Sequence, residues 1–265
     1  MSGGSPVKRG YVRPLNFRDG VVDMGHGAGG RASAQLIEEL FVAAFDNPWL
    51  RQGNDGAAFS PELKPGERMV MATDAHVVSP LFFPGGDIGS LSVHGTLNDV
   101  AMGGARPLYL SASFIIEEGF ALADLKRIVE SMGRASREAG VPIITGDTKV
   151  VERGSGDGVF ISTTGIGIIP NGVDTGGHRA RPGDAILVSG SIGEHGVAIM
   201  SKREGLTFET EILSDSAALH GLVAQMLAVA PGLRVVRDAT RGGLGTALNE
   251  MAGQSGVGGL LDEAA

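Results

Sequence analysis

Apolar residues recur along this chain with two different periods, and these periods predict its helices and strands. Two stretches carry apolar side chains three and four positions apart, as helices with one buried face do, and a third is a longer run of small and apolar residues. Four other stretches are short and apolar on nearly every position, as expected of buried strands. We predict strands at 68–73, 107–117, 141–144 and 159–169, and helices at 31–45, 88–102 and 122–139. The alternation of strand and helix over residues 69–169 indicates one α/β sandwich.

A stretch rich in glycine and proline at 170–183 separates this sandwich from a second part of the chain. Beyond it, the pattern predicts strands at 185–188, 234–236 and 257–261, and helices at 195–202, 216–229 and 244–252. Two or three strands are few for an independent sheet, so the second domain looks incomplete. We therefore predict a two-domain α/β protein, with a flexible N-terminal segment at 1–23, a first domain at 24–170 and a second, truncated domain at 171–265.

Composition narrows the class of protein. The chain has 265 residues, a mean hydropathy of +0.12 and 43 glycines, which indicates a globular protein with many tight loops. Its net charge is -8 and its pI is about 5.3, which argues against a nucleic-acid-binding surface. No apolar run is long enough to span a membrane, and the N-terminus lacks the apolar core of a secretory signal. Because the sequence contains no cysteine, disulfides, thiolate metal sites and a cysteine nucleophile are excluded within these residues, and we expect a cytoplasmic protein.

A glycine-rich loop precedes the first predicted helix. Residues 25–30 read Gly-His-Gly-Ala-Gly-Gly and run directly into helix 31–45. Free backbone N–H groups and the helix dipole make such a junction a ready site for an anion. The stretch also satisfies the dinucleotide pattern Gly-x-Gly-x-x-Gly, but only Val21 and Val22 are available as the preceding strand. A phosphate-binding or loop-closing role is therefore favoured over a dinucleotide site, with a plain structural turn as the alternative.

A second polar motif, Thr-Gly-Asp-Thr-Lys-Val-Val, occupies residues 145–151 and follows the predicted strand 141–144. If the chain stays extended there, Asp147 and Lys149 lie on one face, because residues two apart in a strand share a face. Gly146 would let a ligand approach the backbone. A carboxylate beside an ammonium group suits a metal-bound polyphosphate, and a surface turn with a local ion pair is the alternative.

Five aspartates lie at the ends of predicted elements or among small residues, unlike the acids of ordinary charged helix faces: Asp55, Asp74, Asp99, Asp147 and Asp238. Asp99 belongs to the apolar helix 88–102, where a buried carboxylate is costly unless it meets a cation. Mg²⁺ takes oxygen ligands and is commonly shared between carboxylates and nucleotide phosphates. The loop 237–243, Arg-Asp-Ala-Thr-Arg-Gly-Gly, opens helix 244–252 and is either an anion-binding loop or a helix cap. Because the sequence has no Walker A loop and no kinase motifs, ATP binding would rely on an acid-rich metal cage.

Seven motifs follow one another along the chain: Gly-His-Gly-Ala-Gly-Gly, Asn-Asp-Gly-Ala, Ala-Thr-Asp, Pro-Leu-Phe-Phe-Pro-Gly-Gly, Gly-Thr-Leu-Asn-Asp-Val-Ala, Gly-Asp-Thr-Lys-Val-Val and Arg-Asp-Ala-Thr-Arg-Gly-Gly. In this order they resemble the HypE family of hydrogenase maturation factors, from about residue 21 onward. The wider superfamily includes selenophosphate synthetase and aminoimidazole ribonucleotide synthetase. The resemblance implies a PurM-like fold, with an N-terminal α/β domain that forms a homodimer through its sheet and a C-terminal α/β domain.

The resemblance also implies an activity, the ATP-dependent dehydration of a carbamoyl group on the family's C-terminal cysteine to a thiocyanate. HypF installs the carbamoyl group, and the cyanide passes to the iron held by HypC and HypD for the NiFe hydrogenase centre. By matching motifs, Lys149 and Asp99 are implied in catalysis, Lys149 by stabilising charge on the phosphate or the activated carbamoyl oxygen. The residues implied to bind ATP are Gly27, Gly29, Gly30, Asp55, Asp74, Asn98, Asp147, Thr148, Asp238, Thr240 and Arg241. Those implied to hold Mg²⁺ are Asp55, Asp99, Asp147 and Asp238.

The sequence departs from the family pattern on its C-terminal side. The family continues through an Asn-Glu-Gly stretch with an active-site glutamate and ends in Pro-Arg-(Ile/Val)-Cys, and neither occurs in these residues. Self-carbamoylation of residues 1–265 is therefore not expected. Two alternatives stand beside a HypE-type dehydratase: another ATP-dependent phosphotransferase of the superfamily, and a non-catalytic module that docks to maturation partners. The missing N-terminal cysteine argues against selenophosphate synthetase.

Overall fold

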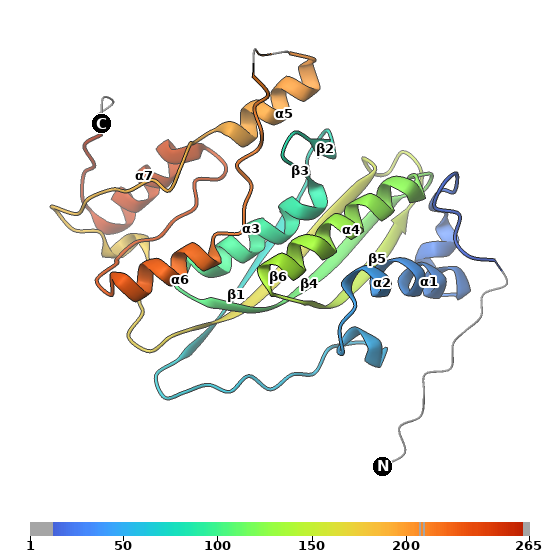
Figure 1. The fold of residues 1–265 in the computed structure, drawn as a ribbon, viewed down its shortest axis with the longest axis horizontal. Helices are drawn as coiled ribbons and strands as arrows, with labels where there is room; N and C mark the ends of the chain where they lie inside the picture. The colour runs from blue at the N-terminus through green and yellow to red at the C-terminus, as the bar shows by residue number, and fades with distance from the viewer. Residues whose placement is uncertain (1–12, 207, 209, 262–265) are drawn as a thin grey trace.

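A four-stranded sheet forms the centre of the chain (Figure 1). The computed structural model describes residues 13–206, 208 and 210–261. The strands lie in the order β1 (Arg68–His76), β6 (Val159–Ile169), β4 (Arg106–Glu117) and β5 (Ile143–Val151). β6 pairs antiparallel with β1 and β4, while β4 and β5 are parallel. The four predicted strands are confirmed, but two are longer than predicted: Asp74 lies within β1, not at its end, and the 145–151 motif lies within β5.

Two helices cover one face of this sheet (Figure 1). They are α3 (Ile88–Met102) and α4 (Leu122–Ala139), and both match predicted segments. The side chain of Asp87 caps α3 by accepting hydrogen bonds from two N–H groups of its first turn. α4 ends at Gly140, whose φ of 69° is the left-handed conformation that glycine adopts without strain. Both helices pack on the sheet to form the main core, which includes Leu97, Leu110, Phe114, Ile128 and Ile161.

The N-terminal part lies beside β5 and α4 (Figure 1). The predicted helix at 31–45 is confirmed. It is one continuous helix made of α1 (Arg31–Leu36), a π-helical turn η2 (Ile37–Val42) and α2 (Ala43–Phe45). The 3-10 helical turn η1 (Met24–Gly27) precedes it. Residues 13–23, predicted to be flexible, are mostly exposed, but three of their side chains contact the core. Val22 is fully buried, and Leu15 and Phe17 pack against the core. Residues 1–12 of the predicted flexible segment lie outside the described residues.

The other face of the sheet carries no helix in the part of the chain that the structure describes (Figure 1). Met69, Met71 and Ile115 belong to this face and are 46%, 71% and 45% exposed. Residues 59–65, from the loop between η3 (Leu50–Gln52) and β1, reach one end of it, where Phe59 packs on Tyr109 with the ring centroids 4.9 Å apart. We call this partly apolar surface the open face.

The second part of the chain is helical in the described residues. Its elements are the 3-10 helical turn η4 (Gly177–Arg179), α5 (Glu194–Glu204), α6 (His220–Val229) and α7 (Gly243–Ser255). The helices predicted at 195–202 and 244–252 are confirmed. The strands predicted at 185–188, 234–236 and 257–261 are wrong, because a strand is stable only when its backbone pairs with a neighbour and the described residues supply none. None of the described helices is long and apolar enough to cross a membrane.

Residues 214–219 form an extended segment along α3, which we call the strap. Asn98 on α3 bonds it at two points: its Nδ2 donates to the C=O of Ala217 at 2.9 Å, and the N–H of Leu219 donates to its Oδ1 at 2.8 Å. The helix predicted from residue 216 therefore begins only at His220, because backbone groups of the strap are already bonded to α3. A short hairpin, β2 (Phe82–Phe83) and β3 (Gly86–Asp87), lies just before α3.

Candidate functional site

The register of the sheet separates the predicted site residues into rows that face opposite sides. Asp74 on β1 pairs with Thr163 on β6, and Thr163 pairs with Ala112 on β4. Thr163 and Ala112 are buried, so this row faces the helices. The neighbouring row joins Ser113 to Asp147, and neighbouring rows of a pleated sheet point to opposite faces. Asp74 therefore lies on the helix side, and Asp147 lies on the open face.

Three aspartates gather on the helix side, where α3, β1 and the loop 237–243 meet. Asp99 on α3 is half-buried, and burial together with the charges of Asp238 and Asp74 raises the pKa of its carboxyl to about 6. The pKa of Asp238 is also raised, first by burial and further by Asp74. Like charges shift one another in this way only when they are held close together. We call Asp74, Asp99 and Asp238 the acidic cluster.

Two arginines of the loop 237–243 face the acidic cluster. Nη2 of Arg241 lies 3.7 Å from Oδ1 of Asp74. Arg237 and Arg241 both act to lower the pKa of Asp99, against the larger effect of burial. The Arg241 side chain is 92% exposed, so its remaining donors face solvent. The cluster thus combines carboxylates, which suit a divalent cation, with guanidinium groups, which suit phosphate oxygens.

Asp147 and Lys149 form a separate pair on the open face. Nζ of Lys149 lies 3.1 Å from Oδ2 of Asp147, which confirms that these two side chains share a face. The structure does not bring this pair to the acidic cluster. The predicted metal set of Asp55, Asp99, Asp147 and Asp238 is therefore not assembled, and no group of three or more acids or histidines among the described residues is arranged to hold a metal ion.

Two glycines that were predicted to admit a ligand lie against neighbouring backbone. A Cβ on Gly146 would lie 2.3 Å from the carbonyl oxygen of Ala112, so the missing side chain lets β5 pair closely with β4. A Cβ on Gly27 would lie 2.6 Å from the backbone nitrogen of Val150, so Gly27 lets η1 pack on β5. Close packing of backbone thus accounts for both glycines, and a ligand beside them stays a prediction.

The remainder of the glycine loop is open. No described atom lies within 4 Å of a Cβ built on Gly29 or Gly30. Gly30 precedes α1 as its N-cap residue, and the N–H of Gly29 donates to Oγ of Ser33 at 2.9 Å. The predicted glycine loop leading into a helix is confirmed, and anion binding by it stays a prediction.

The other predicted ligands lie on exposed loops or strand edges. Asp55 is exposed in the loop before β1. The N–H of Thr148 donates to Oδ1 of Asp147 at 2.8 Å. Thr240 is exposed, and its C=O accepts a hydrogen bond from the N–H of Gly243 at 2.9 Å, which closes the turn before α7. Thr240 is thereby placed beside the arginines of the loop 237–243.

Sequence reasoning missed two residues at the cluster. Arg237 flanks Asp238 and could have been found from its place in the same loop. His76 is buried on β1, and its Nε2 lies 3.7 Å from Oδ2 of Asp74. The signal for His76 was the spacing of two residues, which puts it on the same face as Asp74. The strap is hydrogen-bonded to both ends of the Asn98 amide, and nucleotide binding by Asn98 stays a prediction.

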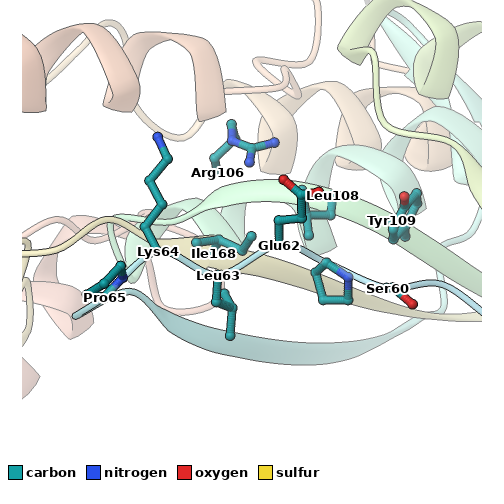
Figure 2. A pocket seen from close by; sticks show the side chains of 10 residues that line it. Ser60, Glu62, Leu63, Lys64, Pro65, Arg106, Leu108, Tyr109 and Ile168 are labelled. Atoms are coloured by element: carbon teal, nitrogen blue, oxygen red, sulfur yellow. The ribbon is translucent and has the colours of Figure 1, made fainter.

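A cavity of about 610 Å³ lies apart from the acidic cluster, at one end of the sheet (Figure 2). Its lining residues are 60–65, Arg106, Leu108, Tyr109 and Ile168. Figure 2 shows Lys64 and Arg106 extending to the same side of the loop and strand. None of the predicted site residues lines this cavity, so it is separate from the candidate site.

Comparison with known families covers both parts of the chain. The family model for AIR synthase related protein, N-terminal domain, matches residues 53–169, and the model for the C-terminal domain matches residues 181–265. Carbamoyl dehydratase HypE of Cupriavidus necator is 76% identical over 265 residues, which are 100% of this chain and 74% of that protein. The chain belongs to the HypE family of carbamoyl dehydratases.

Other members of the HypE family agree in sequence and in fold. Carbamoyl dehydratase HypE of Escherichia coli is 47% identical over 246 residues, 92% of this chain and 73% of that protein. A crystal structure of hydrogenase maturation protein HypE in complex with ATP has a TM-score of 0.85 and 55% identity, over 88% of this chain and 68% of that one. A crystal structure of a HypE–HypF complex has a TM-score of 0.70 and 52% identity, over 83% of this chain and 70% of that one. The predicted PurM-like α/β fold and the resemblance to HypE are confirmed.

Proposed function

We propose that the chain binds Mg²⁺-ATP at the acidic cluster and uses it to dehydrate a carbamoyl group on a cysteine thiol to a thiocyanate. The observation that carries this proposal is the gathering of Asp74, Asp99 and Asp238 with Arg241 where α3, β1 and the loop 237–243 meet, which also raises the pKa of Asp99. Carboxylates crowded in this way are relieved by a cation as well as by a proton. The ATP-bound HypE relative supports the nucleotide as the cofactor.

The residues of the cluster fit both parts of Mg²⁺-ATP. Asp99 and Asp238 offer oxygen ligands, which Mg²⁺ prefers, from two elements that face each other. Arg237 and Arg241 offer N–H donors for phosphate oxygens. The N-terminus of α7, which the loop 237–243 opens, adds a helix dipole favourable to an anion. When bound, ATP would supply the phosphoryl group that makes the carbamoyl oxygen a good leaving group.

The chain's own side chains prepare this site. Burial and the charges of Asp238 and Asp74 raise the pKa of Asp99, and a cation beside it would favour the ionised carboxylate. Asp74 accepts a hydrogen bond from the N–H of Ala75 at 2.8 Å on the same oxygen that faces Arg241. This arrangement leaves Arg241 beside the cluster, where its guanidinium group could reach a bound phosphate.

Lys149 is proposed to stabilise charge on the phosphate or on the activated carbamoyl oxygen. Its place on the open face separates it from the acidic cluster of the same chain. Because the phosphate and the reacting carbonyl must meet, this role cannot be filled within one chain and requires Lys149 of a second copy. A homodimer built on that face would place Lys149 at the subunit interface.

The proposal includes three kinds of partner. Homodimerisation through the open face is supported by the exposed Met69, Met71 and Ile115, because one helix layer covers only the opposite face. The HypE–HypF complex supports a HypF-type carbamoyltransferase as the source of the carbamoyl group. Transfer to a HypC–HypD complex follows from the family resemblance, and a cytoplasmic location stays a prediction from the sequence.

A peptide that ends in an S-carbamoylated cysteine tests the proposed reaction. The chain is incubated with this peptide, Mg²⁺ and ATP, and the mass of the peptide is followed. We expect the peptide to lose one water, with an equal amount of ATP hydrolysed, only when both chain and ATP are present. Asp99→Asn should slow the loss roughly tenfold or more. A peptide that keeps its mass while Mg²⁺-ATP is bound would contradict the proposed dehydration.

A further inference from the structure

The loop 237–243 is anchored at both of its ends to the stretch that links the two parts of the chain. Just before the loop, the C=O of Arg234 accepts a hydrogen bond from the N–H of Gly176 at 3.0 Å. Just after it, α7 packs against η4, where a Cβ on Gly177 would lie 3.5 Å from Cα of Met251. The loop therefore bridges two points that both rest on the linking stretch.

An ion pair strengthens the first of these anchors. Arg234 donates to Asp184 twice, from Nε to Oδ2 at 3.0 Å and from Nη2 to Oδ1. The N–H of Arg181 also donates to Oδ2 of Asp184, at 2.9 Å, which holds the carboxylate within its own turn. The hydrogen bonds from Arg234 and Arg181 lower the pKa of Asp184 to about 2, so the carboxylate is ionised at neutral pH. A two-bond pair of this kind fixes the direction of both side chains.

On the side of the acidic cluster, the loop is held less firmly. Nη2 of Arg241 lies 3.7 Å from Oδ1 of Asp74, which is longer than a hydrogen bond. The Arg241 side chain is also 92% exposed, and exposed ion pairs contribute little to stability. Residues 234–236, which lead into the loop, pair with no strand among the described residues.

We propose that Asp184 is a positioning residue: by holding Arg234 in a two-bond ion pair, it keeps the loop 237–243 beside the acidic cluster. The inference rests on the proposed function, in which the cluster and the arginines of this loop bind Mg²⁺-ATP. Asp184 acts only through Arg234. Without the pair, residues 234–236 can shift and carry the loop with them. Nucleotide affinity then falls, although the four-stranded sheet and α3 still form.

Substitutions at the two ends of the ion pair test this role. We expect Asp184→Ala and Arg234→Ala each to bind Mg²⁺-ATP roughly fivefold more weakly than the unchanged chain in titration calorimetry. The double variant should be no weaker than either single variant, because each change alone already breaks the pair. Losses that add in the double variant would overturn the proposal.

A second comparison distinguishes positioning of the loop from a general loss of stability. In a chain that already carries Arg241→Ala, the phosphate donor that the loop presents is gone. Adding Asp184→Ala should then weaken Mg²⁺-ATP binding by only about twofold, because the two residues act through the same loop. A loss that stays at roughly fivefold in this background would show that Asp184 does not act through the loop, and would overturn the proposal.

Arg51→Ala is the matched control. Arg51 also donates from Nε and from Nη2 to an aspartate, Asp46, but this pair lies in the first part of the chain. We expect Arg51→Ala to bind Mg²⁺-ATP within about twofold of the unchanged chain. If Arg51→Ala weakens binding as much as Arg234→Ala does, the effect is not specific to the loop and the proposal is wrong.

A further measurement does not depend on the nucleotide. Hydrogen exchange of the loop 237–243, followed by mass spectrometry, should be roughly threefold or more faster in Asp184→Ala than in the unchanged chain or in Arg51→Ala. Equal exchange rates would overturn the proposal. If the unchanged chain binds no Mg²⁺-ATP, the proposed function fails by itself. The exchange rates then still decide whether Asp184 holds the loop in place.

Discussion

Asp99 carries a carboxylate at a position where the fold disfavours its charge. Burial, Asp238 and Asp74 raise its pKa to about 6, from an ordinary value of 3.8. An acid whose pKa is raised on folding binds its proton more tightly in the folded state than in the unfolded state. Stability therefore falls as the pH rises from about 4 to about 6, and it stays lower above that range. A bound cation would relieve this cost.

Asp99→Asn should accordingly stabilise the metal-free chain near neutral pH. The amide keeps the shape of the side chain and removes the charge. We expect a gain of about 1 kcal/mol in the free energy of unfolding at about pH 8, smaller than the full pKa shift implies because the half-exposed group is screened by solvent. At about pH 4 the gain should vanish. Denaturant unfolding in the presence of a chelator measures both values, and a variant that is less stable at about pH 8 would show that the cluster imposes no such cost.

The residues of the acidic cluster could be chosen from the sequence, but their arrangement could not. Asp74, Asp99 and Asp238 stood out because each lies among small residues or at an element end. Asp147 met the same criterion, yet it lies on the opposite face, since the pairing of β1, β6, β4 and β5 decides which residues share a side. Strand register depends on contacts far apart in the sequence, and a local pattern does not contain it.

At the scale of elements, the sequence pattern correctly predicted the strands of the four-stranded sheet and the helices that pack on it. Helix α4 and the strands β4 and β6 lie where periodicity placed them. The three strands predicted beyond residue 180 do not form in the described residues, although they are as apolar as β6. A helix makes its own backbone hydrogen bonds, whereas a strand needs a partner. Apolar residues alone therefore could not distinguish a paired strand from an exposed segment such as 185–188, where Leu187 is largely exposed.

The junction between η1 and β5 can be tested with a matched pair of glycines. Gly27→Ala places a Cβ 2.6 Å from the backbone nitrogen of Val150, so η1 must move away from β5. We expect a loss of about 1–3 kcal/mol in the free energy of unfolding. Gly30→Ala is the control, because no described atom lies within 4 Å of its Cβ and its φ is -94°. It should cost no more than about 1 kcal/mol.

Urea unfolding of the two variants distinguishes the roles of these glycines. A Gly27→Ala variant as stable as Gly30→Ala would contradict the packing of η1 on β5. If Gly30→Ala weakens Mg²⁺-ATP binding without a loss of stability, the open part of the glycine loop contacts the nucleotide, as the sequence predicted.

For the whole molecule, we propose a division near residue 170 into a first domain at 24–170 and a second at 171–265. The buried residues of the main core come from residues 22–161, which supports an independent first domain. The strap belongs to the second part and is hydrogen-bonded to Asn98 in the first part. The helix that carries Asp99 is therefore bonded directly to the second part. The acidic cluster likewise draws Asp238 from the second part and Asp74 and Asp99 from the first.

The open face should hold two copies of the chain together. Met71→Lys places a charge on this face, on the edge strand β1 and on a side chain that is 71% exposed in the single chain, and burial of an unpaired charge in an interface is costly. We expect the variant to be a folded monomer at roughly tens of micromolar, where the unchanged chain is a dimer. Val229→Lys, at an exposed position at the end of α6, should remain a dimer. Sedimentation equilibrium that shows the unchanged chain as a monomer would contradict this interface.

The central claim is that nucleotide binds where α3, β1 and the loop 237–243 meet, and titration calorimetry with Mg²⁺-ATP tests it most directly. We predict that Asp99→Asn and Asp238→Asn each weaken binding roughly tenfold or more while the fold is kept, because each removes an oxygen ligand from the cluster. Asp124→Asn, which changes an exposed acid on α4 that pairs with Arg127, should bind within about twofold of the unchanged chain. If Asp99→Asn and Asp238→Asn bind Mg²⁺-ATP as tightly as Asp124→Asn does, the acidic cluster is not the nucleotide site.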